Sequence, residues 1–399
     1  MNLGRIALAL AMDKPKGLAS VASRGKWYSG TSDGTAIDVT YRSMHEALCD
    51  LESLVLMYGN FYNDGRSTNL GVPKINVSID VDGVTYPLFF DNGNSHKTLP
   101  LGARTITDEI RISIKKGTRF FVRTHVLLNT GEKHPTGLTV IGAQNPGEGL
   151  MEGDATAGTF TSQNNNPKYA YAPLVILGEP AHRVNFKTVG FCGSSSSTGA
   201  GHTNTRVDNF PVGEVGFMQI GALRAGWGYV TAGQNGQKAS DFVQLIKRTN
   251  QLQMLKNCDL VIVQYSSNDL ADSSTTFEVL KENILKIHQV YWNMGIPTAQ
   301  VTVNPRTTST DGWTTLQNQT PINANFAPGA NSARGKFNAW VMNNNDGIVG
   351  IDCNKGWESS PDSGLWAVDP TRTSDGIHPN NNGHGFVAAD AVQDYLLAF

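Results

Sequence analysis

The chain has 399 residues, of which 39% are hydrophobic and 17% are charged, and its formal net charge is −2. This balance supports folded cores and argues against general disorder, because disordered chains are poor in hydrophobic residues and rich in charge. It also argues against nucleic acid as the main partner, since phosphate binding requires concentrated Lys and Arg and no basic stretch stands out. The length favours two domains of roughly 150–200 residues each.

The four cysteines give no sign of a disulfide scaffold or of a zinc site, because they are widely spaced and form no C-x-x-C pair. We expect Cys192 and Cys258, which lie in or beside apolar runs, to be reduced core residues, and we expect neither a metal nor an organic cofactor. No apolar run approaches the ~18 residues that a membrane-spanning helix needs. Residues 1–12 faintly resemble a signal peptide, but the apolar stretch is short and no convincing cleavage site follows, so we do not expect cleavage there.

Residues 1–180 read mostly as β structure with an N-terminal extension. Apolar residues alternate with polar ones, which is the period of a half-buried strand, and Asp82-Gly83 is a typical hairpin turn. The pattern predicts strands over residues 75–81, 110–114, 120–126 and 174–177, with the segment after Lys116-Gly117 returning as a second strand. Residues 44–58 fit a helix or a buried strand. Many short strands with turns predict an all-β sandwich of the jelly-roll type.

The pattern changes to alternating strands and helices over residues 181–399. Strands are predicted over 184–191, 260–263, 298–303 and 348–351, and helices over 237–250, 277–292, 333–342 and 383–397. Such alternation predicts parallel strands joined by helical crossovers, that is, a second domain of the α/β class. Ligands of such sheets bind at the carboxyl ends of the strands.

A Gly/Ser run follows the first of these strands. Gly193-Ser194-Ser195 leads through further serines to Gly199 and Gly201. A small-residue loop between strand and helix presents a hydroxyl at the sheet edge and leaves backbone N–H groups free to hold negative charge. Taken alone, the run is equally typical of a flexible loop.

Asp375 precedes His378 by three residues in Asp375-Gly376-Ile377-His378-Pro379. At this spacing the carboxylate is able to bond one imidazole nitrogen, which leaves the other to take a proton from a serine. The alternative is an ordinary turn before the last helix. Asn268 ends a buried strand, where its amide is able to donate a hydrogen bond to an oxyanion; the alternative is a turn that caps the following segment. Gly236 opens a helix, where its N–H is able to face the same oxyanion; the alternative is an ordinary loop glycine.

Taken in order, these four pieces resemble the blocks of the SGNH (GDSL-like) hydrolase family over residues 184–399. The first block, Gly-Asp-Ser, corresponds to Gly193-Ser194-Ser195; the third, Gly-x-Asn-Asp, to residues 266–269; the last, Asp-x-x-His-Pro, to residues 375–379. The resemblance implies a three-layer, flavodoxin-like α/β/α domain over 181–399. It implies ester hydrolysis with Ser195, His378 and Asp375 as triad, and an oxyanion hole made by the N–H groups of Ser195 and Gly236 and the amide of Asn268.

The chain departs from these blocks at two positions, Ser194 in place of Asp and Ser266 in place of Gly. Neither belongs to the triad, so the chemistry is retained, and we expect other bonds from Ser194 or Ser196 to hold the loop. Gly30-Thr31-Ser32-Asp33-Gly34 fits G-x-S-x-G, but no buried strand precedes it, so we interpret it as a surface turn.

The sequence therefore predicts a serine esterase that acts on an acylated carbohydrate, with acetyl as the expected acyl group, or on another small ester. Family members include carbohydrate O-acetylesterases, lipases, lysophospholipases and thioesterases; the β domain and the Asn-rich loops favour the first. The alternatives are a lipase or lysophospholipase, and a virion or cell-surface glycan-binding protein with a weakened hydrolase domain. We expect an extracellular or virion-associated location. For residues 1–180 the sequence allows three roles: they bind glycan, mediate homo-oligomerisation or cover the esterase domain.

Overall fold

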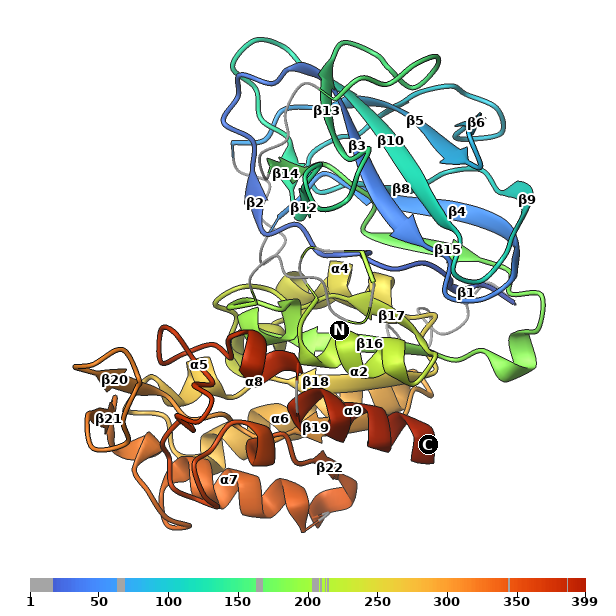
Figure 1. Cartoon of the computed structure of the whole chain (residues 1–399). Coiled ribbons are helices and arrows are strands. Elements are labelled where there is room, and N and C mark those ends of the chain that lie inside the picture. The colour runs from blue at the N-terminus through green and yellow to red at the C-terminus, as the bar shows by residue number, and fades with distance from the viewer. Residues whose placement is uncertain are drawn as a thin grey trace.

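The computed structural model describes residues 17–62, 69–162, 168–202, 208, 210–211, 213, 215–343, 345–385 and 387–399. The signal-peptide-like stretch at residues 1–12 lies outside these ranges. Figure 1 shows antiparallel strands from the first half of the chain in the upper part of the molecule and an α/β arrangement in the lower part.

The first half forms two main antiparallel sheets. One has the order β13-β3-β10-β5-β6 with β7 paired to β5, and the other the order β1-β15-β4-β8 with β9 paired to β4. The first comprises β3 (Asp38–Glu46), β5 (Lys74–Val81), β6 (Val84–Leu88), β7 (Lys97–Thr98), β10 (Arg119–Leu127) and β13 (Gly149–Glu152). The second comprises β1 (Ala19–Ser20), β4 (Leu51–Gly59), β8 (Arg104–Ile106), β9 (Ile110–Ile114) and β15 (Val175–Gly178). The jelly-roll strand order stays a prediction.

In this half of the chain, strand pairing decides between the helix and the strand that the sequence pattern left as alternatives. The ambiguous segment 44–58 is extended, because β3 pairs with β10 and β13 while β4 pairs with β15, β8 and β9. The predicted Asp82-Gly83 turn joins β5 to β6 with positive φ at both residues, as a type I′ hairpin requires. β9 and β10 follow each other in the chain but pair with different strands, so they form no hairpin.

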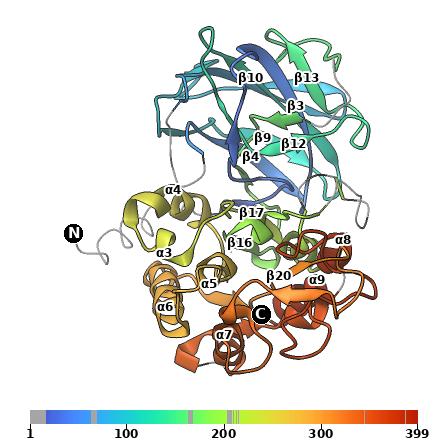
Figure 2. The ribbon, with the colours of Figure 1, turned by 90° about the vertical axis from the view of Figure 1, so that its left-hand side faces the viewer.

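Residues from 181 on contain a parallel sheet of order β17-β16-β18-β19-β22, in which all neighbouring strands run parallel. The strands are β16 (Thr188–Gly193), β17 (Gly228–Thr231), β18 (Leu260–Gln264), β19 (Thr298–Val301) and β22 (Val349–Ile351). The helices are α2 (Phe217–Arg224), α3 (Ala239–Phe242), α4 (Leu245–Leu255), α5 (Ser267–Leu270), α6 (Phe277–Asn293), α7 (Ala333–Met342), α8 (Asn381–Gly385) and α9 (Val387–Ala398). The helices that cover the sheet lie on either side of it, α6 on one and α9 on the other (Figure 2). The prediction of a parallel α/β sheet is confirmed.

Two local predictions in this half were wrong, and one helix was missed. The strand predicted over 184–191 begins only at Thr188, and Arg183–Asn185 form a short 3₁₀ helix because Val184 is 94% exposed and has no core to enter. The helix predicted over 237–250 is two helices, α3 and α4, separated at Val243 and Gln244. Helix α2 was not predicted, since nearly all of its residues are buried and it shows no amphipathic period.

The two halves of the chain meet at β17, the edge strand of the parallel sheet. Ser20 Oγ donates to the carbonyl of Tyr229 at 2.7 Å, Arg24 N–H donates to the Tyr229 hydroxyl at 2.9 Å, and Trp27 N–H donates to the carbonyl of Thr231 at 3.0 Å. The N-terminal segment thereby covers an edge that would otherwise expose unpaired backbone groups. Trp227 and Tyr229 are both buried beside this contact.

The four cysteines are free and buried, which confirms the prediction of reduced core residues for Cys192 and Cys258. Among the described helices, none has the length and apolar character that a membrane crossing requires.

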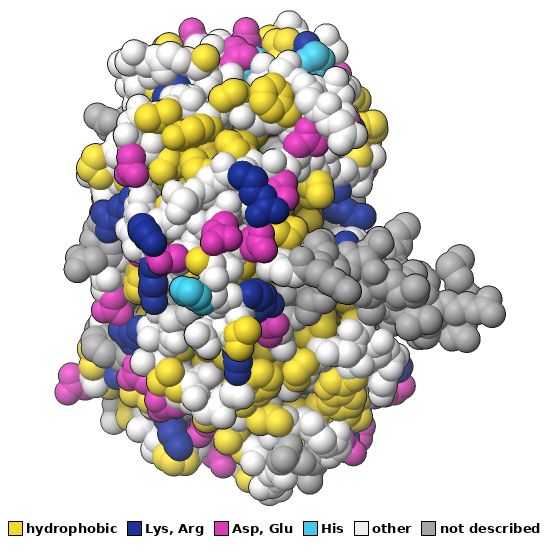
Figure 3. Space-filling view, turned by 90° about the vertical axis from the view of Figure 1, so that its right-hand side faces the viewer, with side chains coloured by type: hydrophobic (Ala, Val, Ile, Leu, Met, Phe, Trp, Pro, Cys, Tyr) yellow, Lys and Arg dark blue, Asp and Glu magenta, His cyan; other side chains and the backbone are white. Residues whose placement is uncertain are grey.

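Figure 3 shows hydrophobic side chains gathered on one face of the antiparallel part. Exposed hydrophobic residues of that part include Phe89, Leu101 and Ile106. The homo-oligomer stays a prediction.

Candidate active site

Every segment that the sequence singled out as catalytic lies at the carboxyl edge of the parallel sheet or on the loop that folds over it. Ser195 follows β16, Gly236 follows β17 and Asn268 follows β18, and these three strands are neighbours in one sheet. His378 and Asp375 come from the loop that precedes α8. The parallel direction of the strands places the three strand-end segments side by side.

The side chains of Ser195, His378 and Asp375 form one chain of hydrogen bonds. Ser195 Oγ lies 2.7 Å from His378 Nε2, and His378 Nδ1 lies 2.7 Å from Asp375 Oδ2. A carboxylate only accepts hydrogen bonds, so Nδ1 carries the proton of the neutral ring. Nε2 is then the acceptor of the Ser195 hydroxyl proton. This is the arrangement in which a histidine acts as the base for a serine nucleophile.

The Asp375 carboxylate is held ionised by its surroundings. Partial burial by itself raises the pKa of Asp375, but hydrogen bonds from the His378 side chain and from the N–H groups of His378 and Ile377 outweigh it and hold that pKa well below its usual value. Both N–H groups donate to Oδ1 at 2.8 Å, which leaves Oδ2 for the imidazole. The carboxylate is therefore both charged and fixed in orientation over the neutral pH range.

The loop that carries Asp375 and His378 is held by a residue that sequence reasoning missed. Thr373 is buried; its hydroxyl donates to the carbonyl of His378 at 2.8 Å and accepts from the N–H of Gly376 at 2.9 Å. The serine loop packs tightly against this loop at Gly201, where an added Cβ would lie 2.3 Å from the Pro379 carbonyl oxygen. Glycine at 201 therefore allows the serine loop to lie this close to the loop that carries His378.

The side chains of Ser194 and Ser197 help to hold the serine loop. The N–H and the hydroxyl of Ser194 both lie 3.3 Å from Gln264 Oε1, at the end of β18. The Ser197 hydroxyl donates to the Ser194 carbonyl at 2.7 Å. Of the two residues expected to replace the missing Asp, only Ser194 supplies such bonds, and Gln264 was not foreseen because it is separated by about 70 positions.

The three groups expected to form an oxyanion hole lie on connected segments. Thr198 joins the serine loop to the loop after β17, because its hydroxyl donates to the Ser195 carbonyl at 2.8 Å and lies 3.2 Å from Asn235 Oδ1. Asn268 Nδ2 donates to the carbonyl of Gln237 at 3.3 Å. Gly236, between these contacts, is exposed and has a φ of 77° in a turn that only glycine adopts readily. Their joint role as an oxyanion hole stays a prediction.

Two further histidines support the serine loop. His384 is buried; its Nδ1 accepts from the N–H of Phe217 at 3.0 Å and its Nε2 lies 2.9 Å from the Ala200 carbonyl oxygen. Burial, and to a smaller extent the neighbouring histidines, lower the pKa of His384 to about 3, so the ring is neutral. His202 is partly buried, and its ring centroid lies 5.8 Å from that of His384.

Ser266, which stands where the family has glycine, is in a backbone conformation that suits glycine. Its φ is 147° and its ψ is −45°. Such a conformation costs an L-residue on the order of 1 kcal/mol or more. We expect Ser266→Gly to raise the melting temperature by a few degrees, measured by scanning calorimetry. Ser266→Ala is the matched control, because it removes the hydroxyl but keeps the Cβ; an equal gain in both variants would contradict the assignment to backbone strain.

Asp269 connects the Asn268 segment to the start of α3. Its carboxylate accepts from the N–H of Ala239 at 2.9 Å and from that of Ser240 at 3.4 Å. Burial raises the pKa of Asp269 to about 6, and these N–H groups oppose the shift only in part. Because this lies above the unfolded value, the folded protein holds a proton between about pH 4 and pH 6 that the unfolded chain has lost. The contribution of this bound proton to the free energy of unfolding is fully present below about pH 4 and is lost as the pH rises through about 6.

We therefore expect Asp269→Asn, which mimics the protonated acid, to become relatively more stable than the wild type as the pH rises from 4.5 to 7.5. The relative gain is on the order of 2–3 kcal/mol and is read from urea unfolding of both proteins at the two pH values. A stability difference that is the same at both pH values would show that Asp269 does not titrate in this range.

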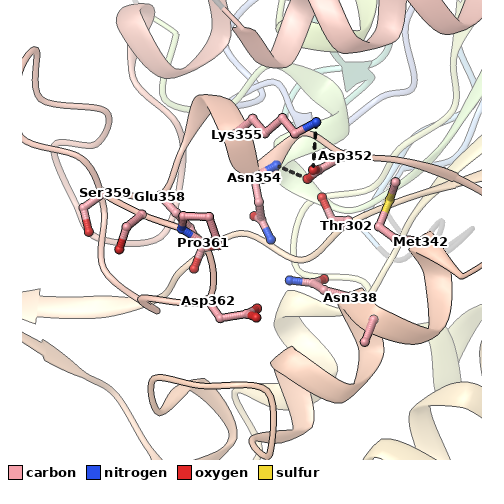
Figure 4. A pocket seen from close by; sticks show the side chains of 12 residues that line it. Thr302, Asn338, Met342, Asp352, Asn354, Lys355, Glu358, Ser359, Pro361 and Asp362 are labelled. Atoms are coloured by element: carbon pink, nitrogen blue, oxygen red, sulfur yellow. Dashed lines mark hydrogen bonds and ion pairs between the residues drawn. The ribbon is translucent and has the colours of Figure 1, made fainter.

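A separate cavity of about 550 Å³ lies beside α7 and the segment after β22 (Figure 4). Asn338, Asp352, Asn354, Glu358 and Asp362 are among the residues that line it, and none of the triad residues does. It is therefore not the place where Ser195 would meet a substrate. In the described part of the chain, no group of three or more His, Cys, Asp or Glu side chains is arranged to hold a metal ion.

Comparisons with known proteins give weak similarities only. No protein-family model and no curated protein matches the chain. Among solved structures, a family two carbohydrate esterase from Clostridium thermocellum in complex with cellohexaose is similar at 12% identity over 95% of this chain and 98% of that one, with a TM-score of 0.38. A family 2 carbohydrate esterase from Corynascus thermopiles (Myceliophthora fergusii) has 12% identity over 96% and 98%, with a TM-score of 0.36. A GDSL-like lipase from Bacteroides thetaiotaomicron has 16% identity over 53% and 88%, with a TM-score of 0.35.

Proposed function

We propose that this protein is a serine esterase that hydrolyses carboxylic esters through an acyl-enzyme. The observation that carries the proposal is the chain of hydrogen bonds from Ser195 through His378 to Asp375, with both distances at 2.7 Å. Ser195 is separated from His378 by 183 positions in the sequence. Asp375 is fixed by two backbone N–H groups in the orientation that a base-orienting carboxylate needs.

In the first step, Ser195 Oγ attacks the ester carbonyl while its proton passes to His378 Nε2. The oxyanion of the tetrahedral intermediate accepts hydrogen bonds from the N–H groups of Ser195 and Gly236 and from the amide of Asn268. The bond to the alcohol oxygen then breaks, and the alcohol leaves with the proton from His378. Water attacks the acyl-enzyme, gives its proton to His378, and the acid leaves as Ser195 regains its proton. Asp375 remains ionised and stabilises the imidazolium.

Within this class we propose a carbohydrate O-acetylesterase. The segments around Ser195 present polar side chains, including Asn235, Asn268 and Arg306, whereas a long acyl chain would need an extended apolar groove. An aromatic ring also stands near the site: a Cβ on Gly376 would lie 2.6 Å from the ring of the partly exposed Trp313. Partly exposed aromatic rings are suited to stacking on sugars.

The test is acetate release from a panel of acetylated polysaccharides, together with initial rates on acetyl and palmitoyl p-nitrophenyl esters. We expect acetate release from at least one polysaccharide and a kcat/KM for the acetyl ester at least about 100-fold above that for the palmitoyl ester, since poorly accommodated chains lose transition-state binding. A preference for the palmitoyl ester would instead indicate a lipase of the same mechanism.

A further inference from the structure

Arg306 lies on the segment after β19, the next strand along the sheet from the one that leads to Asn268. Its Nη1 donates to Asn268 Oδ1 at 3.1 Å and approaches the Ser267 carbonyl oxygen at 3.4 Å. No sequence signal marked this residue, because the contact joins positions separated by 38 residues.

Two neighbours of opposite hydrogen-bonding character fix which way the Asn268 amide faces. A guanidinium has only donors, so the atom that faces Arg306 is the oxygen. The carbonyl of Gln237 is only an acceptor, so the atom 3.3 Å from it is the nitrogen. A reversed amide would place NH₂ against a cation and oxygen against a carbonyl oxygen. The orientation of Asn268 is therefore set by the chemistry of both neighbours.

The same arrangement leaves a donor for the reaction. Asn268 Nδ2 carries two protons, and one is accounted for by Gln237; in the described part of the chain the other has no acceptor. The positive charge beside Oδ1 also polarises the amide and strengthens its N–H as a donor, an effect that is largest away from bulk water. Arg306 is partly buried and also attracts the ionised Asp375 through space.

We propose that Arg306 is a positioning residue of the esterase, which holds the Asn268 amide with Nδ2 toward the oxyanion and polarises it for that role. This inference rests on the proposed function. It predicts an effect of Arg306 on the chemical step through Asn268 and little effect on substrate binding, because a group that stabilises only the transition state alters kcat and not KM.

A double-mutant cycle on p-nitrophenyl acetate tests this, with Arg306→Met, Asn268→Ala and the double variant. We expect Asn268→Ala to lower kcat by about 10²- to 10³-fold, the usual loss for one oxyanion donor. Arg306→Met is expected to lower kcat by about 10- to 100-fold with KM changed less than about twofold. In the Asn268→Ala background, Arg306→Met is expected to cost less than about threefold more, because the group through which it acts is gone.

Arg306→Lys serves as the conservative variant, since an ammonium also donates to Oδ1, and we expect it to retain more activity than Arg306→Met. Arg111→Met is the matched control: it removes an exposed guanidinium on β9, paired with Glu109 and Glu179, and should leave kcat unchanged. Thermal unfolding of every variant identifies misfolded protein, and Arg306→Lys keeps the test valid if Arg306→Met does not fold.

Equal losses from Arg306→Met in both backgrounds would overturn the inference, and so would a change confined to KM, which would indicate direct contact with the substrate. Failure of the proposed function looks different. A Ser195→Ala enzyme that stays active refutes the esterase mechanism itself, whereas an inactive Ser195→Ala enzyme combined with additive losses refutes only the role of Arg306. Full activity of Asn268→Ala would overturn the oxyanion hole and this inference together.

Discussion

Ser195→Ala is expected to lower kcat for ester hydrolysis by about 10⁴-fold or more, because it removes the only oxygen that His378 Nε2 contacts among the described side chains. Removing a triad nucleophile leaves only the catalysis that binding and the oxyanion donors supply. The measurement is steady-state hydrolysis of p-nitrophenyl acetate, with circular dichroism to show that the variant is folded.

The matched control is Ser196→Ala, since it changes the adjacent buried serine, whereas the hydrogen bond to His378 Nε2 comes from Ser195. We expect this variant to keep most of its activity. Labelling with a fluorophosphonate should place the adduct on Ser195 in the wild type and on no serine of this loop in Ser195→Ala. A folded wild-type protein that forms no adduct at Ser195 would favour the alternative of a glycan-binding protein with a weakened hydrolase domain.

Asp375→Asn is expected to lower kcat by about 10⁴-fold while leaving the fold intact, the loss typical of a triad histidine held in the wrong tautomer. In the wild type, Oδ1 accepts two backbone N–H groups, so an asparagine keeps its oxygen there. Its NH₂ then faces His378 Nδ1, which must become an acceptor. The remaining ring proton moves to Nε2, where it faces the Ser195 hydroxyl and prevents the ring from taking the serine proton.

Kinetics of Asp375→Asn from pH 6 to pH 9 provide the measurement, and Asp390→Asn is the control because it neutralises an exposed carboxylate that pairs only with Arg224 among its described neighbours. Asp390→Asn should retain full activity. A loss below about tenfold in Asp375→Asn would mean that His378 adopts its working tautomer without the carboxylate, and the assigned role of Asp375 would be wrong.

The local sequence by itself determined the parallel sheet, one helix and the geometry of the Asp375–His378 segment. The alternation of strand and helix predicted the parallel sheet, and helix α7 was predicted to the residue, since its apolar period and its Ser332 cap are local features. The block from Asp375 to Pro379 likewise carries its own geometry: the carboxylate, two backbone N–H groups and the imidazole all lie within four consecutive residues. Such contacts need no knowledge of the rest of the fold.

Only the tertiary structure decided the features that depend on residues far apart in the chain. Segment 44–58 is extended because other strands pair with it on both sides, and Val184 leaves its predicted strand because no core reaches it. The distance between Ser195 and His378, which are separated by 183 positions, follows from the packing of Gly201 against Pro379. Gln264 and Arg306 were missed for the same reason: the side chains they bond belong to neighbouring strand ends, and strand order is set by the whole sheet and not by local pattern.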